Sequence, residues 1–508
     1  MRIRSISFDD KKYEFSDSSI SSEENTFTIL VGRNGSGKSR ILQRICNIYI
    51  NSLGNDDPYR LNTPVNLNAS NDINNAFSLN YGEITYEQNK NIYEISSNQL
   101  NNGLYNFPIS PFVFEKKIKN SQCKTFFEIA KIIAVSTSPF DKFPIIERHM
   151  HWTNNIYEKK YIYRGGKIKV NSQKDYLKNK FDQLGASLIN FFLRSNRTKD
   201  KVSILLEAIN LDENINMYFS FPWPFSPSEI INTPNPRSIA DSLSSIRFHK
   251  DKGDRITLSQ DEEKILIENL KFVLNYYNFN EHNRIEKFSL ELNLLNRSKD
   301  ENINLLNSLS LLANYDLIEL RDIKFSKNNR NFYLTDSSSG ELSLIFNLLS
   351  IAGEIENDSL ILIDEPEISL HPEWQSDFLP LLSKMFSNYQ GCHFIIATHS
   401  PQILSSTSDE NVFIINLEDS NKLIRSEEIS KMSADYQLAY VFKEPGYKNE
   451  YLTRIALTIF TNVTKKKLFS KDDINSLNLL MENMIHLDKN DPLHQLILSL
   501  KEMRDLYV

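Results

Sequence analysis

An eight-residue loop near the start of the chain constrains the fold more than any other feature of its 508 residues. The run TFTILV at residues 26–31 is typical of a buried strand, and GRNGSGKS at residues 32–39 follows it at once. Isoleucines at helical spacing come next, at Ile41, Ile45 and Ile48. A strand, a GxxxxGKS loop and a helix in this order predict a phosphate-binding loop.

The residue types in this loop suit the phosphates of a nucleotide. Glycines let backbone N–H groups turn inward, and the helix N-terminus adds a partial positive charge. We expect Lys38 to reach the β- and γ-phosphates and the Ser39 hydroxyl to bind Mg²⁺. The nucleotide-binding residues expected here are Gly32, Asn34, Gly35, Ser36, Gly37, Lys38, Ser39 and Arg40.

A second strand pattern, LILI at residues 360–363, runs directly into Asp364 and Glu365. This order places both carboxylates at the C-terminal edge of a parallel sheet, where α/β folds bind ligands. Asp364 suits a water-mediated contact with Mg²⁺, and Glu365 suits polarising an attacking water. An acidic pair after a strand is also typical of a solvated turn, so the pair alone does not decide its role.

Two further motifs flank this strand. SSSGE at residues 337–341 opens a helical pattern, and its small residues can present N–H groups to a second phosphate. The strand pattern at 394–397 ends in THSP, where His399 can reach a γ-phosphate. The ordered set of GRNGSGKS, SSSGE, ILIDEPEISLHP and IIATHSP is far more specific than any one of its members.

This ordered set resembles the ATP-binding-cassette (ABC) ATPases, in the branch that contains RecF, SMC-type and OLD-type proteins. The resemblance covers residues 1–50 and 325–405, about a quarter of the chain. It implies ATP and Mg²⁺ as cofactors, with Ser39 and Asp364 as metal ligands. It also implies a D-loop around residues 369–372 and catalytic roles for Glu365, His399 and Lys38.

The resemblance assigns SSSGE to the signature motif, which binds nucleotide in this family. Family members act as head-to-tail dimers, so Ser338 and Gly340 are expected to complete the other subunit's site. Ser337 stands where the family usually has Leu, a mild change in packing. The nucleotide-binding residues implied here are Ser338, Ser339, Gly340 and Glu341.

The Q-loop glutamine of the family is harder to place. Residues 131–141 (KIIAVSTSPFD) look like a strand that enters a loop at about the right point. Ser136 or Asp141 is a candidate replacement for the glutamine. An ordinary exit from a strand explains the same pattern.

The chain is therefore expected to have an α/β fold built on an ABC-type P-loop head, with a mixed central sheet and flanking helices. No heptad pattern is sustained over several repeats, which argues against a long coiled-coil arm. The expected units are lobe 1 with the P-loop at 1–50, a β-rich part of lobe 1 with the candidate Q-loop at 51–173, a compact helical insertion at 174–324, lobe 2 at 325–420 and a helical partner-docking region at 421–508.

The last helical pattern carries an apolar stripe that something must cover. Two interpretations stay open: the stripe is core, or it docks a partner protein. Its residues are Leu493, Leu496, Ile497, Leu500 and Met503.

Composition and missing motifs exclude several classes of protein. The 58 Lys and Arg against 65 Asp and Glu give a net charge of −7, which argues against a generic nucleic-acid coat. The three cysteines form no CxxC pair, and no signal peptide or membrane span is evident, so a cytoplasmic location without a membrane partner is expected. No DxD pair or RxxxxH motif is present, so no nuclease site is evident. His149 and His151 form an HxH that is expected to be a surface feature.

Two functions fit these patterns. The first is a cytoplasmic ATPase that assembles with itself as a head-to-tail dimer or higher oligomer. It gates a separately encoded nuclease effector of the HNH or Toprim type, similar to Septu-type and retron-associated anti-phage systems, with DNA as a further candidate partner. The alternative is a RecF-like ATPase that clamps DNA in repair or chromosome maintenance. A neighbouring effector gene would favour the first.

Overall fold

The computed structural model describes most of the chain. The residues outside this description are 10, 18, 55–81, 89–90, 100–111, 119–130, 146–159, 167–175, 195–198, 223–238, 240, 243–258, 279–286, 296–299, 316, 328–329, 406–410, 419–422, 430–431 and 508. The HxH pair at 149 and 151 therefore lies outside the described residues. In the part that is described, no helix is both long enough and apolar enough to pass through a membrane.

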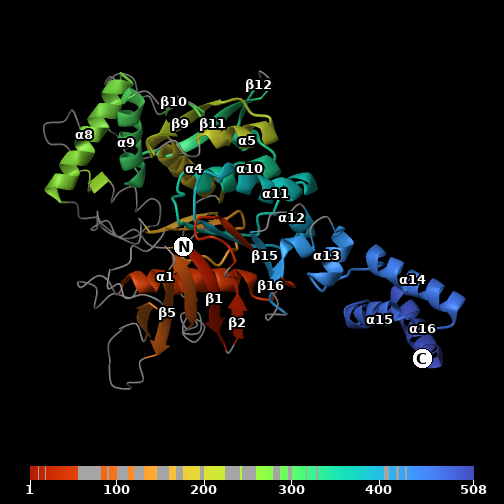
Figure 1. Ribbon diagram of the computed structural model, residues 1–508. Helices are drawn as coiled ribbons and strands as arrows, with labels where there is room; N and C mark the ends of the chain where they lie inside the picture. The colour runs from red at the N-terminus through yellow and green to blue at the C-terminus, as the bar shows by residue number, and fades with distance from the viewer. Residues whose placement is uncertain are drawn as a thin grey trace.

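A seven-stranded sheet forms the centre of the molecule (Figure 1). Every neighbouring pair is parallel except β15 with β16, so the expected mixed central sheet is confirmed. Its inner strands are buried along their whole length, as helices on both faces of a parallel sheet require. In order across the sheet the strands are β16 (Leu423–Arg425), β15 (Val412–Asn416), β3 (Thr26–Val31), β14 (His393–Ala397), β13 (Leu360–Asp364), β7 (Ile132–Ser136) and β8 (Tyr161–Gly165).

The register of this sheet brings the sequence motifs to one edge. Asp364, the last residue of β13, pairs with Ala397 of β14 and with Ser136 of β7. Ala397 in turn pairs with Leu30 of β3, one residue before that strand ends. The P-loop, the acidic pair, the THSP turn and the candidate Q-loop thus leave the sheet side by side.

A five-stranded antiparallel sheet and helix α1 (Lys38–Gly54) cover one side of the central sheet. Helix α1 packs on β13 and β14 of the central sheet and on β4, β5 and β6 of the antiparallel sheet. One continuous apolar core joins these three layers. The strands of the antiparallel sheet, in spatial order, are β2 (Lys11–Glu14), β1 (Arg2–Phe8), β4 (Glu83–Gln88), β5 (Asn91–Gln99) and β6 (Phe112–Ile118).

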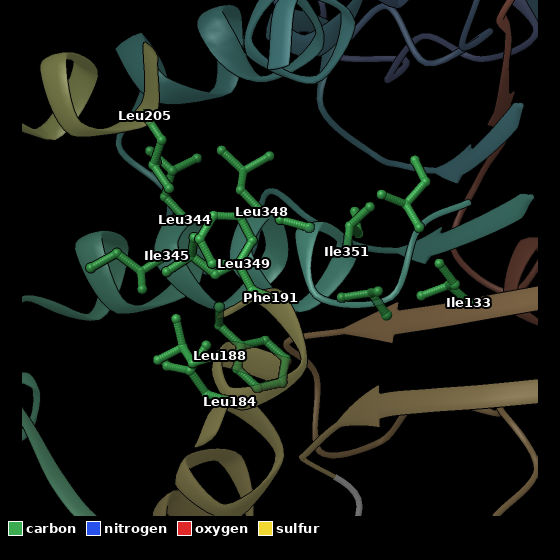
Figure 2. Close-up of a cluster of buried hydrophobic side chains, with 14 of the residues drawn as sticks. Ile133, Leu184, Leu188, Phe191, Leu205, Leu344, Ile345, Leu348, Leu349 and Ile351 are labelled. Atoms are coloured by element: carbon green, nitrogen blue, oxygen red, sulfur yellow. The ribbon is translucent and has the colours of Figure 1, made fainter. Parts of the chain in front are cut away.

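Helices and a third sheet lie on the other side of the central sheet. Figure 2 shows Leu184 and Leu188 of one helix on the side of Ile345 and Leu349 of another, whereas Leu344 and Leu348 lie towards Leu205. Beyond them is a four-stranded antiparallel sheet (Figure 1). The helices are α4 (Tyr176–Leu193), α5 (Lys199–Ile209), α8 (Gln260–Tyr276), α9 (Asp300–Asn314) and α10 (Ser339–Ala352), and the strands in spatial order are β10 (Lys287–Asn293), β9 (Asn214–Ser220), β11 (Glu319–Lys327) and β12 (Arg330–Tyr333).

The expectation of a helical insertion at 174–324 is wrong in that this range also contains strands of a sheet. Strands β9 and β10 lie inside it, and β11 crosses the expected boundary between 324 and 325. The alternation of β9, with Ile215, Met217 and Phe219 buried, spans only one short strand. The partners that stabilise such a strand lie far along the chain, so the helices around it dominate the sequence pattern.

Of the remaining helices, η1 precedes α10, and the others follow the D-loop or the last strands. Figure 1 shows α14, α15 and α16 as a separate bundle that projects from the body of the molecule. Leu493, Ile497 and Leu500 of the apolar stripe are buried in the core of this bundle, and Leu496 and Met503 pack against it. The stripe is therefore core. These elements are η1 (Leu334–Asp336), α11 (Pro372–Met385), α12 (Pro401–Ser405), η2 (Ser426–Glu428), α13 (Ala434–Tyr440), α14 (Glu450–Lys466), α15 (Lys471–Met484) and α16 (Pro492–Tyr507).

A buried charge cluster joins β7 and β8 of the central sheet to the helices α4 and α10. The Glu354 carboxylate, just after α10, accepts from Lys131 Nζ at 2.9 Å and from Arg164 at 2.5 Å. Asn190 of α4 donates to the same carboxylate at 2.7 Å, and Arg194 donates to the Glu354 carbonyl oxygen at 2.9 Å. Burial alone would raise the pKa of Glu354, but Arg164 and Lys131 lower it to about 2.

Candidate nucleotide site

The P-loop follows β3 with a conformation that depends on glycine. Gly32, Gly35 and Gly37 have φ values of +146°, +83° and +101°, a region that side chains disfavour. A Cβ atom at Gly32 would lie only 2.8 Å from Ser36 Oγ, so the tight packing of the loop also requires glycine at this position. Of the other expected residues, Asn34 and Arg40 are exposed. The loop thus has the curled shape that cradles phosphates.

Lys38 begins α1 and points back into the loop. Its ammonium donates to the carbonyl oxygens of Gly32 at 2.8 Å and Arg33 at 3.2 Å, and it lies 3.3 Å from His399 Nδ1. Burial lowers the pKa of Lys38, and Glu365 and Glu367 oppose that shift. The Lys38 ammonium is therefore held inside the loop by two carbonyl groups, which phosphate oxygens would replace as its hydrogen-bond partners.

Ser39 and Asp364 meet across the sheet edge. The Ser39 hydroxyl donates to Asp364 Oδ1 at 2.9 Å, although 325 positions separate them. Burial raises the pKa of Asp364 to about 7, and the bond from Ser39 opposes this. Among the described residues, no cluster of three or more His, Cys, Asp or Glu side chains is suited to a metal. One hydroxyl and one carboxylate fit Mg²⁺, which usually takes few protein ligands and completes its shell with phosphates and water.

Glu365 and His399 face each other beside this pair. Glu365 has a φ of +51°, and its N–H donates to the Ala397 carbonyl oxygen at 2.9 Å, so the turn after β13 is fixed to β14. Its carboxylate lies 3.8 Å from His399 Nε2. Burial, with a further effect of Lys38, lowers the pKa of His399 to about 4, so the imidazole is neutral at pH 7. A carboxylate and a neutral imidazole thus lie next to each other beside the P-loop lysine.

One residue of the site was not anticipated from the sequence. Glu367 accepts a hydrogen bond from the backbone N–H of His399 at 2.6 Å and so fixes the turn that carries this histidine. Burial raises the pKa of the Glu367 carboxyl group. The only sequence signal was its place in the DEPE string after β13, which does not reveal a partner in the turn after β14.

The signature motif begins α10 through a capping box. Ser338 Oγ accepts from Glu341 N at 3.2 Å, and the Glu341 carboxylate accepts from Ser338 N at 3.2 Å and from Lys327 at 3.0 Å. A Cβ atom at Gly340 would meet Ser369 O and a Trp374 ring atom at 2.9 Å, so the motif packs closely against the D-loop. Among the described residues, no hydrogen bond or ion pair joins Ser338, Ser339, Gly340 or Glu341 to the P-loop.

The candidate Q-loop residues have different surroundings. Ser136 Oγ donates to the Asp364 carbonyl oxygen at 3.3 Å and accepts from Ser138 N at 3.1 Å. The Asp141 carboxylate accepts from Phe143 N at 3.0 Å and from the Tyr163 hydroxyl at 2.7 Å. Both residues lie beside the acidic pair, and which of them replaces the glutamine stays a prediction.

Comparisons with known proteins agree with this geometry. Residues 224–405 match a family described as "AAA domain, putative AbiEii toxin, Type IV TA system". The protein named "Retron Vc95 probable ATPase", from Vibrio cholerae serotype O1 biovar El Tor, is 25% identical over 82% of this chain and 74% of its own length. The chain is a P-loop ATPase that is similar to ABC-type AAA ATPases. Its P-loop, acidic pair and THSP turn lie together at one edge of the central sheet.

More distant matches to this ATPase cover less or are weaker. The Septu protein PtuA of Bacillus thuringiensis is 30% identical over 20% of this chain and 29% of its own length. The SMC head domain from Thermotoga maritima aligns over 84% of this chain and 97% of that domain, with 11% identity and a TM-score of 0.27. The fold assignment accordingly depends on the sheet order and the placement of the motifs.

Proposed function

We propose that this ATPase binds and hydrolyses ATP at the interface of a head-to-tail dimer and gates a separately encoded effector in anti-phage defence. The relatives named as a retron ATPase and a Septu protein support the defence role. A nuclease effector of the HNH or Toprim type is the partner we propose. The single observation that carries the dimer is the position of the signature motif within one subunit.

One subunit holds an incomplete site. The P-loop, Asp364 and His399 meet at the sheet edge, whereas the signature motif contacts the D-loop and Lys327 instead. The first N–H groups of α10 have no partner within a helix and suit the phosphates of a nucleotide bound to another subunit. A two-fold axis would then form two composite sites.

The chemistry proposed for each site follows from its contacts. Lys38 would exchange two carbonyl partners for the β- and γ-phosphates, and Ser39 with Asp364 would hold Mg²⁺. When bound, this ion neutralises charge that develops on the phosphates. Glu365 would orient the attacking water and accept its proton, while His399 would donate to a γ-phosphate oxygen.

A mixing experiment tests the composite site. Lys38→Ala and Ser338→Arg should each abolish ATPase activity in homodimers, because both composite sites of such a dimer lose either the P-loop lysine or the signature serine. A mixed dimer would keep one intact site, formed by Ser338 of the first variant and Lys38 of the second. We expect the mixture to recover up to a quarter of the wild-type rate, from half the molecules with one site each. Proven heterodimers without activity would contradict a shared site that works independently.

The effector is proposed to dock on the helical bundle at the C-terminal end of the described chain. A groove with a volume of about 890 Å³ runs beside α14 and α16, and its lining includes Arg454, Leu457 and Leu496. The hydroxyls of Thr458 and Thr461 bond to their own helix at 2.7 Å, which leaves their methyl groups for contact. An amphipathic helix of the effector is the occupant that fits this groove.

Two leucines of the bundle offer a matched test of this docking. Leu457 lines the groove and is 51% exposed, whereas Leu468 is 62% exposed and does not line it. We expect Leu457→Asp to lose at least tenfold in affinity for the nuclease encoded by the neighbouring gene, as for a buried anchor. Leu468→Asp should bind like the wild type, and both variants should keep the ATPase activity. Equal binding by the two variants in a pull-down would contradict the groove.

A further inference from the structure

The side chain of Arg33, the second residue of the P-loop, leaves the nucleotide site and contacts the C-terminal segments. Its guanidinium donates to the Lys443 carbonyl oxygen at 3.2 Å and contacts His486 Nδ1, between α15 and α16. Its Nε lies 3.6 Å from Glu418 and 3.7 Å from Glu444. A single P-loop side chain therefore meets three segments that follow β15.

His486, the partner of Arg33 on the bundle, is suited to accept a hydrogen bond from the guanidinium. Burial and the Arg33 charge lower the pKa of His486, so its ring is neutral and Nδ1 can accept a hydrogen bond. The two carboxylates also face the guanidinium, and because these ion pairs are partly exposed they contribute little by themselves. The hydrogen bonds to Lys443 and His486 fix the geometry.

The backbone of the same arginine contacts the nucleotide-binding lysine. Lys38 Nζ donates to the Arg33 carbonyl oxygen at 3.2 Å. Phosphates would draw the ammonium away from this carbonyl group, and the glycines on either side of the turn would let it rearrange. A change at the phosphate site thus reaches the residue that holds the bundle.

We propose that Arg33 is a positioning residue that couples nucleotide occupancy of the P-loop to the placement of α14–α16. Nucleotide binding loosens the contacts of Arg33 with Lys443 and His486, and displacement of the bundle makes nucleotide binding tighter. Linkage requires both effects to have the same magnitude, and couplings of this kind typically change affinity by about 5- to 150-fold. The consequence of this coupling rests on the proposed function, because the bundle is the surface on which we propose that the effector docks.

Hydrogen exchange of the full chain, without effector, tests the coupling. The probe is AMP-PNP, which binds without being hydrolysed. We expect it to speed amide exchange at least about fivefold in residues 441–448 and 484–491 of the wild type. Arg33→Ala should still bind AMP-PNP, but exchange in these two segments should no longer respond to it. Arg425→Ala is the matched control, because Arg425 is also partly exposed and paired with a carboxylate, that of Asp17, and it should keep the response.

An affinity measurement approaches the coupling from the other side. His486 is remote from the phosphates, so His486→Ala should change AMP-PNP binding only through Arg33, making it at least about fivefold tighter. Adding Arg33→Ala to His486→Ala should give no further gain of this kind, a non-additivity that independent sites do not show. Unchanged affinity in His486→Ala, or an exchange response that survives Arg33→Ala, would overturn the proposal. Neither measurement involves hydrolysis or an effector, so failure of effector docking would be seen separately.

Discussion

Glu365→Gln is expected to lower the rate of ATP hydrolysis at least about 100-fold while leaving ATP binding intact. The amide has the size of the carboxylate and keeps the same backbone, which Ala397 anchors at 2.9 Å. It loses the ability to accept a proton from water, and general-base catalysis is typically worth about 10²–10⁴ in rate. Phosphate release measures the rate, and equilibrium binding of labelled ATP measures the affinity. Glu14→Gln, an exposed carboxylate on β2, is the control that should hydrolyse at the wild-type rate.

The same variant should accumulate in the ATP-bound dimer. In the proposed dimer, ATP binding would drive assembly and hydrolysis would reverse it, so blocking hydrolysis alone would trap the assembled state. Light scattering with and without ATP would show a doubled mass for Glu365→Gln and a shorter-lived dimer for the wild type. Hydrolysis at the wild-type rate by Glu365→Gln would instead contradict the role assigned to this carboxylate.

The nucleotide site could be predicted from the sequence because its parts occur at strand ends. A parallel sheet brings the C-terminal ends of its strands to one edge, so motifs after β3, β13 and β14 had to meet there. The bond between Ser39 and Asp364, at 2.9 Å, confirms that placement. Each of these motifs also carries its own local signal, in glycine spacing or in a strand that runs into charged residues.

Contacts that depend on the tertiary arrangement could not be predicted in this way. Glu367 meets the backbone of His399, and Arg33 meets His486, only because distant segments fold side by side. The four-stranded sheet was not predicted for the same reason, because Met217 of β9 pairs with Leu290 on one side and with Ile323 on the other. Sequence periodicity reports which face of an element is apolar, but it does not report which element covers that face.

The largest expected effect on stability concerns Glu354, the anion of the buried charge cluster. Its carboxylate is 1% exposed and compensates Lys131 and Arg164, which are themselves buried. Glu354→Gln would remove the buried anion that these two cations share, and breaking a buried pair typically costs about 3–5 kcal/mol. We expect urea unfolding at pH 7 to show a loss of this size. Glu356→Gln is the matched control, because Glu356 faces Lys131 and Arg194 but is 59% exposed, and it should cost less than about 1 kcal/mol.

The pH dependence of the wild type gives an independent measure of the same cluster. The pKa of Glu354 is about 2 in the folded chain, against an ordinary value of 4.5. A depressed pKa means that the unfolded chain binds the proton more tightly, so the carboxylate stabilises the fold above about pH 4.5. That contribution, about 3 kcal/mol from the size of the shift, is lost as the pH falls from about 4.5 towards 2. Over this interval Glu354→Gln should lose less stability than the wild type, because it has no proton to take up at this position. Parallel stability curves for the two proteins would contradict a lowered pKa of Glu354 in the folded chain, because Lys131 and Arg164 stay charged throughout this interval.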